Sequence, residues 1–323
     1  MLDRYGRVIN YLRISVTDRC NLRCCYCMPE GVQDVGMKSI LTFEEIWEIV
    51  RTGVSLGITH IRITGGEPLV RKGCVDLIRG IREIPVVETI TMTTNGVLLG
   101  NYGKQLKEAG VDGVNISLDT LDPEEFYKIT GKRELQEVLA GIRAAKTAGL
   151  PVKLNAVNRK ELDPIPLVRY AQEENLPLRF IEMMPVGYGK KYVGRSNEEL
   201  RETLEAVCGK AECMTNREEL SRMGSGPAVY YQFSDLKVPV GFISAIHGKF
   251  CDTCNRVRLT AEGYLKLCLC YDEGEDLRRV LREGEKENLR TIMEQTIFRK
   301  PAAHCFEHPA EMTETHEMVK IGG

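Results

Sequence analysis

Six short runs of strand-forming residues recur along the first two-thirds of the chain, and longer segments with helical periodicity separate them. The runs are Tyr11–Val16, His60–Thr64, Thr89–Thr93, Gly113–Leu118, Val152–Val157 and Leu178–Met183. Strands that alternate with helices form right-handed βαβ units on a parallel sheet. Six such units predict an α/β fold, a partial (β/α)6 barrel of the TIM type.

The segments between the runs carry ordinary helix signals. Phe43–Leu56 places its apolar residues on one broad face, and Glu134–Ala148 is rich in helix formers and ends at Gly149. Asp122 followed by Pro123 and two acidic residues predicts a helix N-cap.

Polar and glycine-rich residues follow every one of the six runs. The Cys20 loop follows the first run, a Gly-Gly-Glu-Pro turn the second and Thr94-Asn95-Gly96 the third. Asp119, Asn158 and a Met-Met-Pro-Val-Gly segment close the other three. The active sites of (β/α) barrels lie on the rim formed by the carboxyl ends of the strands. Six polar strand ends therefore predict one shared site.

Three cysteines, Cys20, Cys24 and Cys27, form a C-x-x-x-C-x-x-C run directly after the first strand. Thiolates this close together can hold three irons of a cubane iron–sulfur cluster and leave the fourth iron open. The same spacing would also place three cysteines on one face of a buried helix. Asp18, Arg19 and their polar neighbours make that alternative a poor one.

A second group consists of Cys251 and Cys254, with Cys268 following. This spacing predicts a metal framework, and a structural zinc site with Cys270 or His247 as fourth ligand is an alternative to a cluster. Arg256 and Arg258 alternate on an extended segment, so both point to one side. Two guanidinium groups there suit a triphosphate or a purine edge.

Composition excludes several classes of function. The net charge of the 323 residues is −2, so no global field would attract nucleic acid or an anionic membrane. The first residues are charged where a secretory leader would be apolar, and no apolar run reaches the length of a membrane span. We expect a cytoplasmic protein. Twelve cysteines, clustered mainly in the two groups, then favour metal or cluster ligation over disulfides.

The cysteine run and the turn Gly65-Gly66-Glu67-Pro68 together resemble the radical S-adenosylmethionine (SAM) superfamily. That resemblance implies a [4Fe–4S] cluster on Cys20, Cys24 and Cys27, with SAM bound at its open iron. It also implies a partial or full (β/α) barrel.

Longer segments look like the GTP 3′,8-cyclase family of molybdenum cofactor biosynthesis. They are Tyr11–Cys27, Arg62–Pro68, Phe250–Thr260 and the terminal Gly322-Gly323. The resemblance implies that a 5′-deoxyadenosyl radical from SAM takes the 3′ hydrogen of GTP. Ring closure onto C8 and reduction would then give 3′,8-cyclo-7,8-dihydro-GTP. The implied partners are a reductant such as flavodoxin or ferredoxin and, downstream, cyclic pyranopterin monophosphate synthase; a homodimer is left open.

The same resemblance implies a set of site residues. A second [4Fe–4S] cluster would sit on Cys251, Cys254 and Cys268 and hold the guanine of GTP. SAM would contact Tyr26, Gly66, Ser117 and Met184. The GTP pocket would be lined by Arg13, Arg62, Thr93, Lys153, Arg179, Arg256, Val257 and Arg258. Catalytic roles would fall to Arg256, Arg258, Gly322 and Gly323.

The polar stretch around Met223–Pro227 predicts a boundary between a barrel at residues 1–222 and a C-terminal region at 223–323. That smaller α+β region would carry the second cluster and a diglycine tail that enters the active site. Cys25 and Cys270 are extra thiols, and Cys270 could close the second cluster. The weaker alternatives are a peptide-modifying radical SAM enzyme with auxiliary clusters and a non-catalytic zinc or electron-transfer module.

Overall fold

A computed structural model describes residues 1–31, 36–192, 194–224 and 226–322. These residues form one sheet of twelve strands in the order β12-β11-β10-β1-β2-β3-β4-β5-β6-β9-β8-β7. The bounds are β1 (Tyr11–Ser15), β2 (His60–Thr64), β3 (Thr89–Thr94), β4 (Gly113–Ser117), β5 (Val152–Asn158), β6 (Leu178–Glu182), β7 (Ala211–Cys213), β8 (Val229–Phe233), β9 (Val240–Ile243), β10 (Arg256–Leu259), β11 (Tyr264–Lys266) and β12 (Gly274–Asp276).

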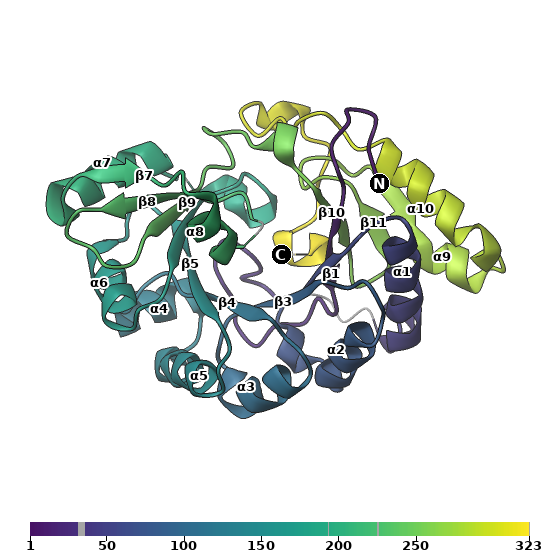
Figure 1. Cartoon of the computed structure of the whole chain (residues 1–323), viewed down its shortest axis with the longest axis horizontal. Coiled ribbons are helices and arrows are strands. Elements are labelled where there is room, and N and C mark those ends of the chain that lie inside the picture. The colour runs from purple at the N-terminus through teal and green to yellow at the C-terminus, as the bar shows by residue number, and fades with distance from the viewer. Residues whose placement is uncertain (32–35, 193, 225, 323) are drawn as a thin grey trace.

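The middle of the sheet is parallel and its two edges are antiparallel. Strands from β10 through β1 to β6 and β9 pair in parallel, whereas β11 and β12 at one edge and β8 and β7 at the other pair antiparallel. The sheet curves strongly but its order ends at β12 and β7, so the barrel is not closed (Figure 1).

The predicted α/β partial barrel is confirmed. Each of the six predicted runs is a strand, and their bounds agree to within one residue. The C-terminal region extends this same sheet: β9 pairs with β6, and β10 pairs with β1. The division of the chain at residue 223 stays a prediction, and Ser225 within that boundary lies outside the described residues.

Most helices cover the outer, convex face of the sheet (Figure 1). They are α1 (Phe43–Ser55), α2 (Cys74–Arg82), α3 (Leu99–Glu108), α4 (Pro123–Thr130), α5 (Leu135–Thr147), α6 (Ile165–Glu173), α7 (Asn197–Cys208), α9 (Leu277–Arg282) and α10 (Leu289–Phe298). The short helix α8 (Arg217–Arg222) lies inside the curve instead (Figure 1). Short 3₁₀ turns are η1 (Met37–Ser39), η2 (Pro68–Val70), η3 (Gly187–Lys191), η4 (Cys251–Thr253), η5 (Lys286–Asn288), η6 (Pro309–Glu311) and η7 (Met318–Ile321).

Local sequence explains several helix starts. Thr42 with Glu45, and Ser196 with Glu199, form capping boxes at α1 and α7. Asp122 caps α4 as predicted, because its side chain accepts hydrogen bonds from the first-turn amides. These caps satisfy backbone donors that would otherwise lack partners.

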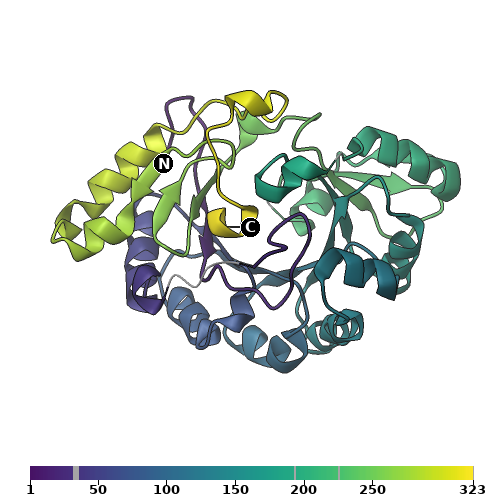
Figure 2. The same cartoon turned by 180° about the vertical axis from the view of Figure 1, so that it is seen from behind.

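The main hydrophobic core lies between the sheet and the outer helices. Leu12 and Ile14 of β1, Ile61 and Ile63 of β2 and the facing helix residue Ile49 are all fully buried there. Alternation along each strand therefore turns the intervening residues, many of them polar, towards the inside of the curve. Figures 1 and 2 both place the C-terminus inside this curve. Within the described ranges, none of the helices combines the length and the hydrophobicity needed to cross a bilayer.

Candidate active site

The loop of the first cysteine group is held tightly against the end of β2. Backbone hydrogen bonds run from Gly66 N to Thr17 O (2.7 Å) and from Glu67 N to Arg19 O (2.9 Å). A Cβ atom on Gly66 would lie 2.4 Å from the Arg19 carbonyl oxygen, and one on Gly65 would lie 2.5 Å from that of Thr17. The two glycines are therefore required by the packing of the loop itself.

Glu67 joins this loop to the neighbouring strand end. Its buried carboxyl accepts hydrogen bonds from Thr94 Oγ1 (2.9 Å) and Asn95 N (2.7 Å). Asn95 Nδ2 in turn lies 3.7 Å from Cys20 Sγ. Burial raises the pKa of Glu67 to about 7. The Glu67 carboxyl group thus connects the ends of β2 and β3, and Asn95 extends this connection to Cys20.

The three thiols of the first group suit a cationic iron–sulfur centre. Burial raises the pKa of Cys20 to about 11 and that of Cys27 to about 12. Burial also holds the pKa of Cys24 well above its usual range, and the neighbouring charges of Cys27 and Cys20 add to this effect. Crowded thiolates of this kind need a positive centre to stay ionised, and cluster irons supply it. The donor set therefore fits a [4Fe–4S] cluster.

Tyr26 is fixed beside these cysteines by Asp119, which follows β4. The Tyr26 hydroxyl donates to Asp119 Oδ2 (2.7 Å), and Asp119 Oδ1 accepts from the Val157 amide (2.8 Å). Both carboxylate oxygens are thus engaged, which holds the tyrosine ring in one place.

The second cysteine group lies at the opposite end of the sheet from the first. Cys251 and Cys254 precede β10, and β10 runs parallel to β1, whose carboxyl end leads into the Cys20 loop. Tyr11 at the start of β1 pairs with Arg256, next to Cys254. Four residue steps along β1 span about 13 Å, so the two groups face one another along the strand direction.

Cations and neighbouring thiols surround the second group. Burial raises the pKa of Cys251, and the charges of Cys268 and Cys254 add to it, so the three sulfurs are close neighbours. Burial alone would raise the pKa of Cys254 as well, but Lys300 and Arg256 lower it overall. A thiolate stabilised by nearby cations is a good cluster ligand. This donor set also fits a [4Fe–4S] cluster.

The fourth ligands considered for a zinc ion are engaged elsewhere. Cys270 is fully buried, with its Sγ 2.9 Å from Cys305 Sγ, in an apolar cluster with Val186 and Phe306. Within the described ranges, no three His, Cys, Asp or Glu side chains lie close enough to hold a single metal ion, so neither cysteine group forms a compact single-ion site. The Cys270 thiol is thus paired with Cys305, and Cys268 of the second group packs against the same apolar cluster.

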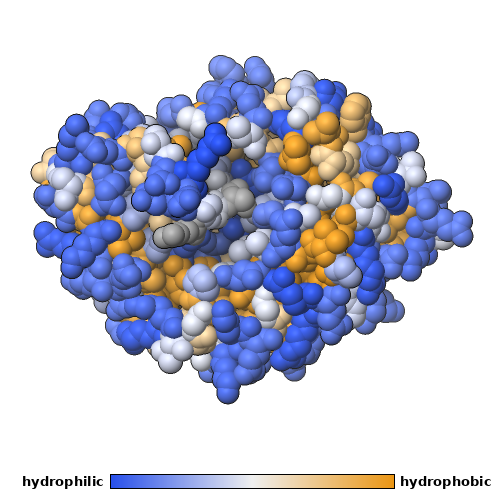
Figure 3. Space-filling view, in the orientation of Figure 1, coloured by the Kyte–Doolittle hydropathy of each residue, from blue (hydrophilic) through white to orange (hydrophobic). Residues whose placement is uncertain are grey.

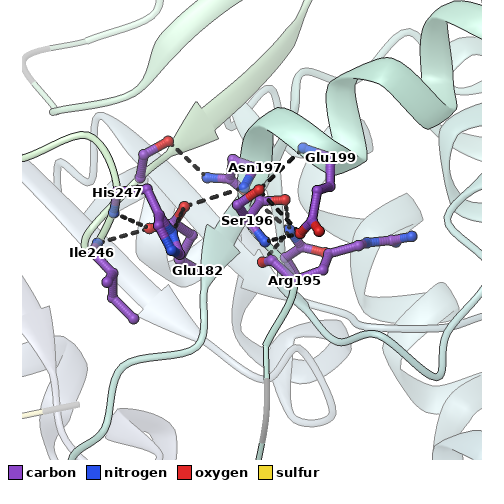
Figure 4. A network of polar contacts seen from close by, with 9 residues as sticks. Glu182, Arg195, Ser196, Asn197, Glu199, Ile246 and His247 are labelled. Carbon is purple, nitrogen blue, oxygen red and sulfur yellow. Dashed lines mark hydrogen bonds and ion pairs between the residues drawn. The ribbon is translucent and has the colours of Figure 1, made fainter. Parts of the chain in front are cut away.

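His247, the other candidate, belongs to a structural network at the end of β6 (Figure 4). The Glu182 carboxylate accepts hydrogen bonds from the amides of Asn197 (3.1 Å) and Ile246 (2.7 Å). It also lies 3.0 Å from His247 Nδ1. Glu182 thus joins β6, the start of α7 and the loop after β9, so this polar strand end serves the fold.

A cavity of about 270 Å³ lies inside the curve of the sheet. Figure 3 shows the molecule hollowed at the same place. The predicted site residues that line it are Arg13, Arg62, Thr93, Ser117, Arg179, Met184, Cys251, Cys254, Arg256, Arg258 and Cys268. The cavity therefore reaches from the second cysteine group towards the carboxyl ends of β3, β4 and β6.

Three arginines form a row across adjacent strands inside this cavity. Arg258 of β10 pairs with Arg13 of β1, and Arg13 pairs with Arg62 of β2. Neighbouring strands lie about 4.8 Å apart, so three guanidinium groups share one level of the sheet. Arg256, two residues before Arg258, faces the same side.

Two arginines of the row, Arg13 and Arg258, have lowered pKa values. Burial and the charges of Arg258 and Arg62 hold the pKa of Arg13 well below its usual range. Burial and Arg256 lower the pKa of Arg258 to about 10. Burial alone would raise the pKa of Tyr11, but Arg62 and Arg13 lower it overall. Buried like charges at this spacing are stable only with a counter-charge, so the cavity is suited to a polyanion.

Arg179 extends the positive lining on the far side of the cavity, and Lys153 lies close behind it. Arg179 Nε donates to Asn155 Oδ1 (2.9 Å), and its Nη2 donates to Asn115. Lys153 is not part of the cavity lining; its Nζ donates to the Met223 carbonyl (2.8 Å). Burial, Arg179 and Arg62 lower the pKa of Lys153 to about 8.

Several other predicted residues lie outside the cavity lining. Val257 is fully buried in the core on the opposite face of β10 from the arginines, so only its backbone could meet a ligand. Tyr26 and Gly66 lie with the first cysteine group. Gly322, with φ 87°, has its carbonyl oxygen 2.9 Å from Arg258 Nη1. Gly323 lies outside the described residues.

Several residues that line the cavity were not identified from the sequence. Tyr11, Asn155, Lys300 and Arg7 all line the cavity. Arg7 Nη1 donates to the Cys251 carbonyl (2.9 Å). Alternation along β1 places Tyr11 on the face of Arg13 and could have identified it. Nothing local distinguishes Arg7 or Lys300 from surface charges.

Comparison with known proteins agrees with this architecture. Residues 14–164 match the radical SAM superfamily, and residues 176–306 match the family described as Molybdenum Cofactor Synthesis C. The crystal structure of Streptococcus suis SuiB bound to S-adenosylmethionine is similar with a TM-score of 0.65, covering 97% of this chain and 77% of that one. Its sequence identity is 15%, so this likeness concerns the fold alone.

The sequence relatives are closer. The chain is 42% identical to the GTP 3′,8-cyclase of Clostridium perfringens (strain 13 / Type A) over the full length of both. It is 44% identical to that of Thermodesulfovibrio yellowstonii, again over the full length of both. The fold and the cysteine loops define a radical SAM protein. Within that superfamily, the chain belongs to the GTP 3′,8-cyclase family.

Gly66→Ala tests the packing of the first cysteine loop. The added methyl group would overlap the Arg19 carbonyl, which costs about 1–3 kcal/mol in a well-packed site. We expect reduced iron binding at the first group after anaerobic reconstitution, with the second group still loaded. Gly100→Ala, where a Cβ would meet nothing within 4 Å, is the matched control. Full iron content in Gly66→Ala would contradict this account.

Lys153 should take up a proton when a polyanion binds. With its pKa near 8 it is partly neutral at pH 8.5, and added negative charge nearby favours the protonated form. Affinity for the anion should therefore fall as the pH rises through 8. Calorimetry of GTP binding in buffers of different ionisation enthalpy measures the uptake. Lys153→Arg should abolish it, and equal uptake in that variant would refute the assignment.

Proposed function

We propose that this chain converts GTP into 3′,8-cyclo-7,8-dihydro-GTP, the first step of molybdenum cofactor biosynthesis. The observation that carries the proposal is the in-register row Arg258, Arg13 and Arg62. The row lies in a cavity that is lined by the second cysteine group and reaches towards the carboxyl ends of the strands, where the first group lies. GTP brings about four negative charges, and such a row supplies the counter-charges that they need.

Each cysteine group has a separate task in this proposal. Cys20, Cys24 and Cys27 would hold the cluster that binds SAM, and Cys251, Cys254 and Cys268 would hold the cluster next to the guanine. When bound, the first cluster with SAM supplies the radical that removes the 3′ hydrogen of GTP. The protein's contribution is then to hold the ribose at a fixed place between the two groups.

The chain's own residues provide that positioning. Arg256, Arg258, Arg13 and Arg62 would bind the triphosphate, and Arg179 would be held by Asn155 and Asn115 to face the same space. A tyrosine ring fixed by Asp119 would lie beside SAM. A curved sheet around an enclosed cavity also keeps water from a reactive radical.

The reaction needs an electron source, for which we propose a flavodoxin or ferredoxin. We also propose that cyclic pyranopterin monophosphate synthase consumes the product. All twelve cysteines are free thiols, which supports a reducing compartment such as the cytoplasm. A peptide substrate would leave the arginine row without a role, so we do not propose one.

Isotope transfer tests the reaction directly. Hydrogen removal, ring closure and one-electron reduction with a proton give a product isomeric with GTP, so mass alone cannot distinguish them. GTP deuterated at C3′, incubated anaerobically with SAM and reductant, should pass its deuterium to 5′-deoxyadenosine. A new chromatographic isomer should accumulate. Unlabelled 5′-deoxyadenosine with unchanged GTP would refute the proposal.

Arginine variants test the pocket. Arg256→Ala and Arg62→Ala should each weaken GTP binding at least about tenfold, because a charge-assisted contact is lost. SAM cleavage without GTP should continue in both. Arg51→Ala, at an exposed position on α1, is the matched control. Unchanged GTP affinity in both pocket variants would show that the triphosphate binds elsewhere.

Metal analysis separates two clusters from one cluster and a zinc ion. We expect about eight irons per chain after anaerobic purification, since each cubane holds four. No stoichiometric zinc should accompany them. About four irons with one zinc would remove the second cluster from the proposal.

A further inference from the structure

Several residues besides Gly322 anchor the last described segment of the chain. Val319 and Ile321 of η7 are almost fully buried. Ile321 packs with Leu269 and Phe306 in a small apolar cluster beside the second cysteine group. Lys320, between the two apolar residues, points the other way and approaches the loop of the first group.

Lys320 makes an ion pair with the loop that carries the first cysteines. Its Nζ lies 2.7 Å from Asp18 Oδ2, and Glu262 lies 3.7 Å away. The side chain of Asp18 is only 6% exposed and that of Lys320 19%. By contrast, Lys128 and Glu125 on α4 form a pair of equal length whose side chains are 68% and 40% exposed. An enclosed pair is screened less by solvent than such a surface pair.

The loop end of this pair is rigid. Asp18 lies between Thr17 and Arg19, whose carbonyls accept the Gly66 and Glu67 amides. A charge held this firmly gives a fixed attachment point. Removing Lys320 would leave the Asp18 carboxylate enclosed without its main partner, which is costly.

The same short segment touches both halves of the candidate site. At one end, the Val319 amide lies beside the Cys27 thiol of the first group. At the other end, the Gly322 carbonyl accepts a hydrogen bond from Arg258 of the arginine row. Met318 lines the cavity.

We propose that Lys320 is a positioning residue whose ion pair with Asp18 latches the C-terminal segment to the first cluster loop. This ion pair holds the Val319 amide beside Cys27. It also holds the Gly322 carbonyl where Arg258 donates a hydrogen bond to it. Docking of the C-terminal segment is therefore coupled to the environment of the first cluster: a change in one changes the other. The inference rests on the proposed function only for the identity of the bound cluster.

Hydrogen exchange of the reconstituted holoenzyme under anaerobic conditions tests the latch. Lys320→Met should speed exchange of the amides of residues 318–322 by about tenfold, the loss of an enclosed ion pair. Asp18→Asn should do the same, and the double variant should show no more than either single one. Lys320→Arg should restore slow exchange, and Lys128→Met serves as the control.

A second measurement separates positioning from general loosening. Loss of an amide hydrogen bond to a cluster thiolate shifts the reduction potential of that cluster. The potential of the first cluster should therefore shift in Lys320→Met and recover in Lys320→Arg, while that of the second stays unchanged. Wild-type exchange in Lys320→Met, additive effects in the double variant, or an unmoved potential would each overturn the latch.

These measurements do not depend on GTP turnover. If the deuterium experiment failed but exchange and potential responded as described, the latch would stand and the substrate assignment would fall. If GTP were cyclised but Lys320→Met behaved as wild type, only the latch would be lost.

Discussion

Three arginines at one level of three adjacent strands form the interaction on which the site depends. Backbone pairing fixes the register of β10, β1 and β2, so Arg258, Arg13 and Arg62 cannot move apart along the strands. The lowered pKa values of Arg13 and Arg258 reflect the electrostatic cost of burying these charges side by side. A fold selected for stability alone would not place them there, and a bound polyanion removes the penalty.

The parallel arrangement of β10 and β1 decides where the two cysteine groups lie. One group follows the carboxyl end of its strand and the other precedes the amino end of its own. Parallel pairing sends these ends to opposite edges of the sheet. The cavity runs along the strands from the second group towards the first, with the arginine row between. This axis suits the nucleotide orientation proposed above, in which the base and the ribose lie near different centres.

Local patterns predicted the six barrel strands, the cysteine loops and the glycine turn, because each depends on neighbouring residues. The pairing of β10 with β1 joins segments more than two hundred residues apart, and no local signal reports it. The roles of the polar residues at the strand ends could not be predicted from the sequence either. Glu182 supports three elements and Asp119 holds Tyr26, whereas Ser117 lines the cavity. The sequence identifies such residues as a group, but only the tertiary contacts show which of them support the fold and which line the cavity.

The C-terminal segment closes a gap that the open sheet leaves. Since the sheet order ends at β12 and β7, no strand pairing seals the interior of the curve. A tail folded inside it supplies apolar contacts through Ile321 and polar contacts through Lys320 and Gly322. Contacts to both cysteine groups make its docking sensitive to either one. The tail is not part of the sheet, so its docking depends on these side-chain contacts and on no strand pairing.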